Sequence, residues 1–220
     1  MLVSHRRRFI YLKTKKTAGT SVEIYFEPAC LPEGHAYEEA HLRPTVETSA
    51  GVIGQRGSRI VDSWYNHMPA AEVQARLGEA WDAYLKFCCV RNPYDRLVSA
   101  FWMLIGPEER QALASVSFDE VRARFARWMT VCHIVDDRAV YEIQGRPVVD
   151  MVIRYEALLE DLEAVCEATG VPFEPERLGR YKGESRLRDE PYLDYYDADT
   201  LAQANEVYAS QFEWFGYARH

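Results

Sequence analysis

The sequence predicts an α/β domain built on a parallel sheet, and three observations carry that prediction. Short apolar stretches at residues 9–12, 84–90 and 152–155 are each followed by a helical pattern. The stretch 84–90 is apolar almost throughout, as is typical of a strand covered on both faces of a parallel sheet. At 220 residues, of which 48% are hydrophobic, the chain can bury one such core, so we expect a single domain over residues 1–220.

Net charge and cysteine content argue against several functional classes. A net charge of −8 disfavours general binding to nucleic acid or anionic membranes, which depends on Lys and Arg neutralising phosphates. No apolar run approaches membrane-spanning length and no signal peptide is recognisable, so we expect a cytoplasmic protein without an integral membrane segment. The five cysteines are odd in number and show no C-x-x-C spacing, which argues against a disulfide framework or a zinc site.

Residues 13–21, Lys-Thr-Lys-Lys-Thr-Ala-Gly-Thr-Ser, connect the first apolar stretch to a predicted helix. The first N–H groups of a helix lack intrahelical partners and the helix dipole adds positive charge there, so this turn can hold a phosphate or sulfate. Thr20 followed by Glu23 fits a capping box, which predicts a helix start near Thr20. Because the phosphate-loop pattern with Lys after its second Gly is absent, an ordinary structural turn stays open at this point.

Residues 27–63 show no lasting helical or alternating pattern and contain several Pro and Gly residues. We expect a long irregular connection here, which is either a binding loop or a surface insertion. Order returns with a helix that begins at Pro69 and ends before Gly78. His67 lies just outside the N-terminus of that helix, where it is either a structural hydrogen-bonding residue or a catalyst.

The stretch 84–90 leads into a helix with Asn92 as its N-cap. Arg91 therefore lies at the carboxyl end of a strand, where ligands bind in open α/β sheets. A guanidinium group at Arg91 and a hydroxyl at Ser99 together suit a phosphate monoester, whereas the alternative is that Arg91 pairs with Asp95. Because this turn and residues 13–21 both follow strands at one edge of the predicted sheet, we favour two phosphate subsites.

The remaining patterns predict further elements and one basic segment. The elements are a helix at 117–129 with a capping box, strands at 138–141 and 148–155 around a turn at 144–147, a helix at 156–169 closed by Gly170, and a last helix at 199–212. Residues 179–188 are basic in an otherwise acidic chain. They form either a solvated loop or a segment that closes over a nucleotide.

Three motifs in this order resemble those of the sulfotransferases that use 3′-phosphoadenosine 5′-phosphosulfate (PAPS). Residues 16–21 resemble the loop for the 5′-phosphosulfate, and residues 90–99 resemble the motif for the 3′-phosphate. Residues 66–70 lie where the bacterial and carbohydrate-directed branch, similar to heparan sulfate 2-O-sulfotransferase, carries a catalytic histidine. The resemblance spans about residues 9–217, and the ordered set is more specific than any single motif.

This resemblance implies a three-layer α/β sandwich with a central parallel sheet, similar to that of P-loop nucleotide kinases. It also implies transfer of a sulfonate group from PAPS to an acceptor hydroxyl, with adenosine 3′,5′-bisphosphate leaving and no metal required. In that scheme Lys16 contacts the bridging oxygen and His67 is the general base. The donor is held by Lys16, Thr17, Ala18, Gly19, Thr20, Ser21, Arg91, Ser99, Lys182 and Arg186.

Departures from the family pattern leave alternatives open. Lys15 stands where the family usually has Pro, and the spacing to Gly19 favours Lys16 over Lys13 and Lys15 as the lysine that reaches the sulfonate. Acidic residues and a histidine in the irregular segment are alternative bases; these are Glu38, Glu39 and His41.

The competing functions are a P-loop-like nucleotide or small-molecule kinase and a non-catalytic nucleotide-binding module. A carbohydrate or glycoconjugate is the favoured acceptor, and residues 27–63 could line its site, but lipid, peptide and natural-product hydroxyls stay open. Neither the sulfated position nor the oligomeric state follows from the sequence.

Overall fold

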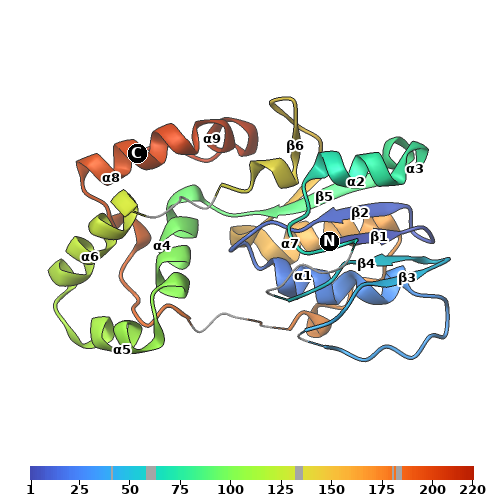
Figure 1. Cartoon of the computed structure of the whole chain (residues 1–220), viewed down its shortest axis with the longest axis horizontal. Helices are drawn as coiled ribbons and strands as arrows, with labels where there is room; N and C mark the ends of the chain where they lie inside the picture. The colour runs from blue at the N-terminus through green and yellow to red at the C-terminus, as the bar shows by residue number, and fades with distance from the viewer. Residues whose placement is uncertain (41, 58–62, 132–135, 180, 182–184) are drawn as a thin grey trace. The chain divides into compact units, whose positions relative to one another are not determined.

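The computed structural model describes residues 1–40, 42–57, 63–131, 136–179, 181 and 185–220. These residues divide into two compact units, each built from two segments of the chain (Figure 1). Unit 1 contains residues 1–90 and 137–181, and unit 2 contains residues 91–136 and 182–220. That residues 1–220 act as one domain stays a prediction.

Unit 1 is organised around a six-stranded mixed sheet. The strand order is β3 (Val46–Thr48), β4 (Gly51–Ile53), β1 (Leu2–Ser4), β2 (Phe9–Leu12), β5 (Leu85–Val90) and β8 (Met151–Arg154). Strands β2, β5 and β8 are parallel, with Tyr11 opposite Phe87 and Phe87 opposite Met151, whereas β1, β3 and β4 pair antiparallel. The predicted α/β class is therefore confirmed, and its parallel part is the half that carries the motif-bearing turns.

Helices cover both faces of this sheet. Helices α1 (Gly19–Phe26) and α7 (Leu158–Thr169) lie against one face (Figure 1), where their apolar side chains share a core with Phe9, Phe87 and Ile153. Side chains alternate along a strand, so Lys86 points to the other face. There it donates to the carbonyl of Trp81 in α3 (Glu79–Ala83), and α2 (Ala70–Leu77) precedes α3 in the chain. Unit 1 thus has three layers.

Unit 2 is helical. It consists of α4 (Pro93–Leu104), α5 (Pro107–Ser115), α6 (Phe118–Val131), the 3₁₀ turn η6 (Tyr192–Tyr195), α8 (Ala198–Val207) and α9 (Ala209–Phe215). Its core is rich in aromatic residues, and Phe125 contacts Phe101, Trp128 and Tyr195 edge-on or stacked. Asn92 caps α4 by accepting the N–H of Tyr94 at 3.0 Å, as predicted. Ser117 and Glu120 form the predicted capping box of α6.

The structure corrects four expectations about individual elements. Residues 138–141 are not a strand: they hold the 3₁₀ turn η2 (Arg138–Val140), and the hairpin follows as β6 (Glu142–Ile143) and β7 (Arg146–Pro147). Its turn residues Gln144 and Gly145 both have positive φ, 53° and 76°, as a type I′ turn requires. The segment 27–63 contains η1 (Glu27–Cys30), β3 and β4. The last helix is divided in two at Tyr208.

The fourth correction concerns the capping box of α1: the helix begins at Gly19, close to the predicted start, but its N-cap position is Ala18 and no side chain caps it. Two further 3₁₀ turns, η3 (Tyr155–Ala157) and η4 (Pro175–Arg177), flank α7, which ends at Gly170 with φ 65°.

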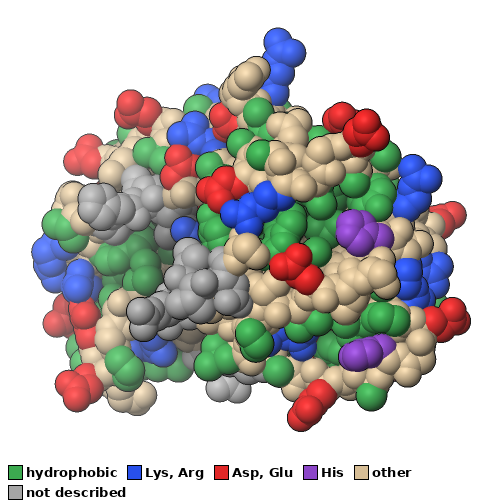
Figure 2. Space-filling view, turned by 45° about the vertical axis from the view of Figure 1, so that its right-hand side comes forward, with side chains coloured by type: hydrophobic (Ala, Val, Ile, Leu, Met, Phe, Trp, Pro, Cys, Tyr) green, Lys and Arg blue, Asp and Glu red, His purple; other side chains and the backbone are tan. Residues whose placement is uncertain are grey.

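None of the helices in the described residues combines the length and the apolarity that crossing a bilayer demands. Acidic and basic side chains are interspersed on the face shown in Figure 2, which agrees with an anion site that is local.

Candidate functional site

The turn between β2 and α1, residues 13–18, has an unusual backbone. Lys16 and Ala18 lie in the left-handed region, with φ 64° and 61°. Such conformations cost about 1–3 kcal/mol for residues other than glycine and persist only where the surrounding structure enforces them. Left-handed residues beside right-handed ones turn successive N–H groups toward one side, which makes a concave anion site.

Several N–H groups of this turn are left for a ligand. Within α1 the carbonyl of Ala18 accepts from Ser21 at 2.9 Å and from Val22 at 3.3 Å. Among the described residues, no acceptor is found for the N–H groups of Thr17, Ala18, Gly19 and Thr20. Groups of this kind at a helix N-terminus bind phosphate and sulfate. The backbone therefore suits the predicted anion site, although not through the expected Thr20 cap.

Gly19 is required by close packing. A Cβ atom at Gly19 would lie 3.0 Å from the carbonyl oxygen of Thr14 and 3.2 Å from the hydroxyl of Tyr11. That hydroxyl donates to the carbonyl of Gly19 at 3.1 Å. The turn is also tied to β5, because the Thr14 hydroxyl donates to the carbonyl of Cys89 at 2.5 Å.

The three lysines of the turn have different surroundings. Lys13 is 3% exposed, and its ammonium group contacts Glu23 Oε2 at 2.6 Å. Lys15 is exposed and Lys16 is half-buried. Because the charge of Lys13 is already opposed by a buried carboxylate, Lys13 is a poor candidate for contact with a ligand.

A buried ion cluster lies beneath the turn. Glu23 on α1 and Glu27, which follows the last residue of that helix, are both fully buried. Arg56 Nη1 contacts Glu23 at 2.7 Å and Glu27 at 2.6 Å, and Arg43 contacts Glu27 at 3.0 Å. Burial alone would raise the pKa of Glu23, but the surrounding cations, including Lys13, hold it below its ordinary range. The cluster fastens residues 43–56 and the base of the turn to α1.

His67 lies beside the turn. Its Nδ1 atom is 2.9 Å from the carbonyl oxygen of Lys13, and its backbone is left-handed with φ 58°. Because a carbonyl only accepts, Nδ1 carries the proton and Nε2 keeps a lone pair. Burial, followed by the positive charge of Lys13, lowers the pKa of His67 from 6.5 to about 3. The imidazole is therefore neutral at pH 7 and oriented as a proton acceptor.

In unit 2, Arg91 and Arg186 share one carboxylate. Arg91 contacts Asp95 Oδ2 through Nε at 2.8 Å and Nη2 at 2.7 Å, so the pairing left open by the sequence is present. Arg186 Nη1 contacts Asp95 Oδ1 at 3.2 Å. Two guanidinium groups thus converge on one carboxylate. Ser99 is one turn beyond Asp95 on α4, on the same face of the helix.

The predicted site residues are thus distributed over both units. Unit 1 brings His67 to the turn that contains Lys16 and residues 17–21, whereas unit 2 brings Arg186 to Arg91. Lys182 and His41 lie outside the described residues. The sequence did not indicate Asp137, whose carboxylate accepts the N–H of Lys15, because 122 positions separate them.

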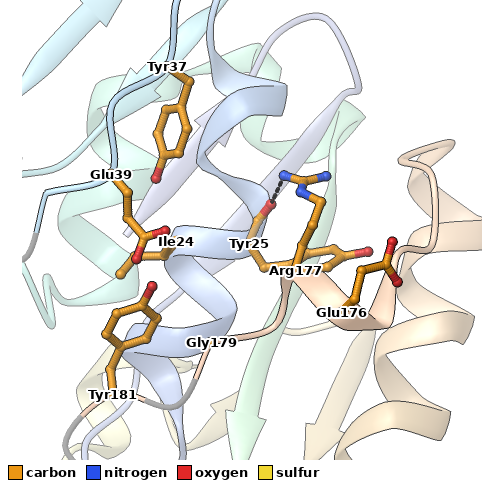
Figure 3. Close-up of a pocket in the computed structure, with 8 residues that line it drawn as sticks. All are labelled: Ile24, Tyr25, Tyr37, Glu39, Glu176, Arg177, Gly179 and Tyr181. Carbon is orange, nitrogen blue, oxygen red and sulfur yellow. Dashed lines mark hydrogen bonds between the residues drawn. The ribbon is translucent and has the colours of Figure 1, made fainter.

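A cavity of about 500 Å³ lies along α1 in unit 1 (Figure 3). Figure 3 shows the hydroxyls of Tyr37 and Tyr181 pointing toward each other, with the carboxylate of Glu39 between them. The N–H of Tyr181 donates to Ser21 Oγ at 3.4 Å, so one end of the cavity adjoins the first turn of α1. Its lining consists of Ile24, Tyr25, Tyr37, Glu39, Glu176, Arg177, Gly179 and Tyr181.

Comparison with known proteins gives one match. A family model described as the sulfotransferase family matches residues 1–218, nearly the whole chain. No curated protein and no solved structure shows a significant match.

Proposed function

The chain belongs to the sulfotransferase family, and we propose that it transfers a sulfonate group from PAPS to a hydroxyl of a carbohydrate or glycoconjugate. The observation that carries the proposal is the hydrogen bond from His67 Nδ1 to the carbonyl of Lys13. It holds a neutral imidazole, with a free Nε2 lone pair, against a turn whose N–H groups suit an anion. A proton acceptor beside an anion site is what sulfonate transfer to a hydroxyl needs.

We assign the two ends of the donor to the two sets of residues. The N–H groups of residues 17–21 hold the 5′-phosphosulfate, and Lys16 contacts the oxygen that bridges phosphorus and sulfur. Arg91, Ser99 and Arg186 bind the 3′-phosphate together with Lys182.

The reaction itself is a direct displacement at sulfur. The acceptor oxygen forms a bond to sulfur while the bond from sulfur to the bridging oxygen breaks, and adenosine 3′,5′-bisphosphate leaves. His67 Nε2 takes the hydroxyl proton, and the Lys16 ammonium group stabilises the negative charge that grows on the bridging oxygen. As in phosphoryl transfer, positioning and charge stabilisation supply most of the rate enhancement.

The cavity along α1 is our candidate for the acceptor site. Tyrosine rings suit the faces of sugar rings, and the carboxylates of Glu39 and Glu176 can accept from hydroxyl groups. These two exposed carboxylates would repel the phosphates of the donor, so the lining fits an uncharged acceptor better. Tyr37 and Glu39 come from residues 27–63, which gives that segment the substrate-binding role considered from the sequence.

We place the activity in the cytoplasm. Four buried cysteines, Cys30, Cys88, Cys89 and Cys166, are free thiols, which suits a reducing compartment.

A transfer assay tests the proposed function. The protein is incubated with sulfonate-labelled PAPS and a panel of oligosaccharides, glycolipids, hydroxylated peptides and phenols. We expect label in a hydroxyl of an oligosaccharide or glycolipid. Label found only in peptides or phenols would overturn the acceptor class, and no transfer to any hydroxyl would overturn the proposed activity.

A further inference from the structure

The turn at residues 13–18, called the donor turn below, accepts support from a distant part of the chain through one hydrogen bond. The N–H of Lys15 donates to Asp137 Oδ2 at 2.6 Å, and Asp137 is 4% exposed. Hydrogen bonds to an ionised acceptor are among the stronger ones in proteins, and burial strengthens them further. The bond fastens the backbone immediately before Lys16, which is the residue held in the left-handed conformation.

Asp137 is itself held by the fold of unit 1. Its carbonyl accepts the N–H of Val140 at 2.9 Å, and η2 packs against α2. Helix α2 follows His67 and Pro69 directly. The carboxylate is therefore supported by the same helix whose N-terminus adjoins His67.

The carboxylate of Asp137 places a negative charge beside the proposed anion site. A negative charge beside an anion site opposes binding of a phosphosulfate, because like charges repel over such short distances. A structural benefit must offset that repulsion, and the bond to the N–H of Lys15 supplies one. A proline at this position would fix φ by its ring but would have no N–H to donate.

We propose that Asp137 is a positioning residue that keeps the donor turn in its anion-binding conformation by accepting the N–H of Lys15. In this chain the hydrogen bond does for the backbone what the ring does in a proline. The effect on the donor rests on the proposed function, whereas the effect on the backbone of the turn does not.

Hydrogen exchange of the ligand-free protein tests the backbone effect. In Asp137→Ala the hydrogen-bonded amides of Lys15, Ser21 and Val22 should exchange about tenfold faster, and in Asp137→Asn, which keeps a neutral acceptor, no more than about threefold faster. Lys15→Ala keeps the N–H and should exchange like the unmodified protein. Glu163→Ala, at an exposed position on α7, is the matched acidic control. Unchanged exchange in Asp137→Ala would overturn the proposal.

Calorimetry with adenosine 3′,5′-bisphosphate then tests the effect on the donor. Asp137→Ala should weaken binding about tenfold, and Asp137→Asn about threefold. Lys15→Pro removes the N–H, so Lys15→Pro with Asp137→Ala should bind no more weakly than Lys15→Pro alone. Losses that multiply in the double variant would overturn the proposal. If the unmodified protein binds no bisphosphate while exchange changes as expected, the proposed function fails and the role of Asp137 in the turn stands.

Discussion

The imidazole of His67 donates from Nδ1 to the carbonyl oxygen of Lys13 across 2.9 Å. This bond selects one tautomer and leaves Nε2 as an acceptor. The same Lys13 uses its ammonium group on Glu23 in the protein interior. One residue of the turn therefore orients the proposed base through its backbone and anchors the turn through its side chain.

Replacing the proposed base should affect turnover far more than donor binding. In His67→Ala we expect kcat to fall by at least about 100-fold, because a positioned general base contributes roughly 10²–10⁴-fold. The dissociation constant for adenosine 3′,5′-bisphosphate should change little. His35→Ala, at an exposed histidine of unit 1, is the control. Nearly normal turnover in His67→Ala would remove the assigned role.

The pH behaviour of His67 should depend on the donor. Its pKa is lowered to about 3, so the free protein should show no titration of this ring between about pH 5 and 8. Bound bisphosphate adds negative charge beside the ring, which favours the protonated form and raises its pKa. NMR titration, with His67→Gln to assign the signal, measures both states. A midpoint near 6.5 in the free protein would contradict the described burial.

The lowered pKa of His67 also predicts how the free energy of unfolding depends on pH. The folded protein resists protonation of His67, whereas the unfolded chain takes up a proton near pH 6.5. The free energy of unfolding should therefore decrease as the pH falls from about 6.5 toward 3, and His67→Gln should lose less stability over that range. Denaturant unfolding at several pH values measures this difference, and parallel curves for both proteins would contradict it.

Replacing Lys16 should lower turnover much more than replacing Lys15. Lys16→Met should lower kcat by about 10²–10³-fold, the range found when a group that stabilises growing negative charge is removed. Lys15→Met removes the same charge one residue earlier and should lower kcat by less than about tenfold, since its exposed side chain is placed away from the leaving group in our assignment. Initial rates at saturating donor measure both variants. The reverse order would assign the leaving group to Lys15.

The guanidinium of Arg91 should discriminate between nucleotides. Arg91→Ala should weaken the binding of adenosine 3′,5′-bisphosphate by about 10- to 100-fold, as expected for a lost charged hydrogen bond. The affinity for adenosine 5′-monophosphate, which lacks the 3′-phosphate, should fall much less. Arg122→Ala on α6 of the same unit is the control. Equal losses for the two nucleotides would undo the assignment.

The cavity along α1 should serve the acceptor and not the donor. Glu39→Gln and Tyr181→Ala should raise KM for the acceptor about tenfold or less, because each removes one or two contacts. The dissociation constant of the bisphosphate should stay within about twofold of that of the unmodified protein. A loss of bisphosphate affinity with unchanged acceptor KM would assign this cavity to the donor.

Local patterns predicted the parallel half of the fold well. Strand β5, the Asn92 cap of α4 and the Gly170 end of α7 follow from apolar runs and capping residues within a few positions. The antiparallel strands β3 and β4 are three residues each, too short to show alternation. The capping box predicted for α1 was wrong because Glu23, which completes the sequence pattern, contacts Lys13 and Arg56 in the buried ion cluster.

The sequence could propose the candidate site as a set of residue types but could not predict its geometry. Order and spacing singled out Lys16, His67 and Arg91, since motifs keep their spacing in the chain. The contacts that orient them join distant positions: Lys13 with His67, and Asp137 with Lys15. Backbone φ values such as those of Lys16 and Ala18 depend on these contacts, so no local pattern reveals them.

The central claim is recognition of a sulfonate donor that carries a 3′-phosphate. Calorimetric titration of the unmodified protein with adenosine 3′,5′-bisphosphate, and separately with ATP and magnesium, tests it most directly. We predict micromolar or tighter binding of the bisphosphate, about −8 kcal/mol or more favourable, and much weaker binding of ATP. Binding of ATP with magnesium, and none of the bisphosphate, would contradict the account and favour a kinase.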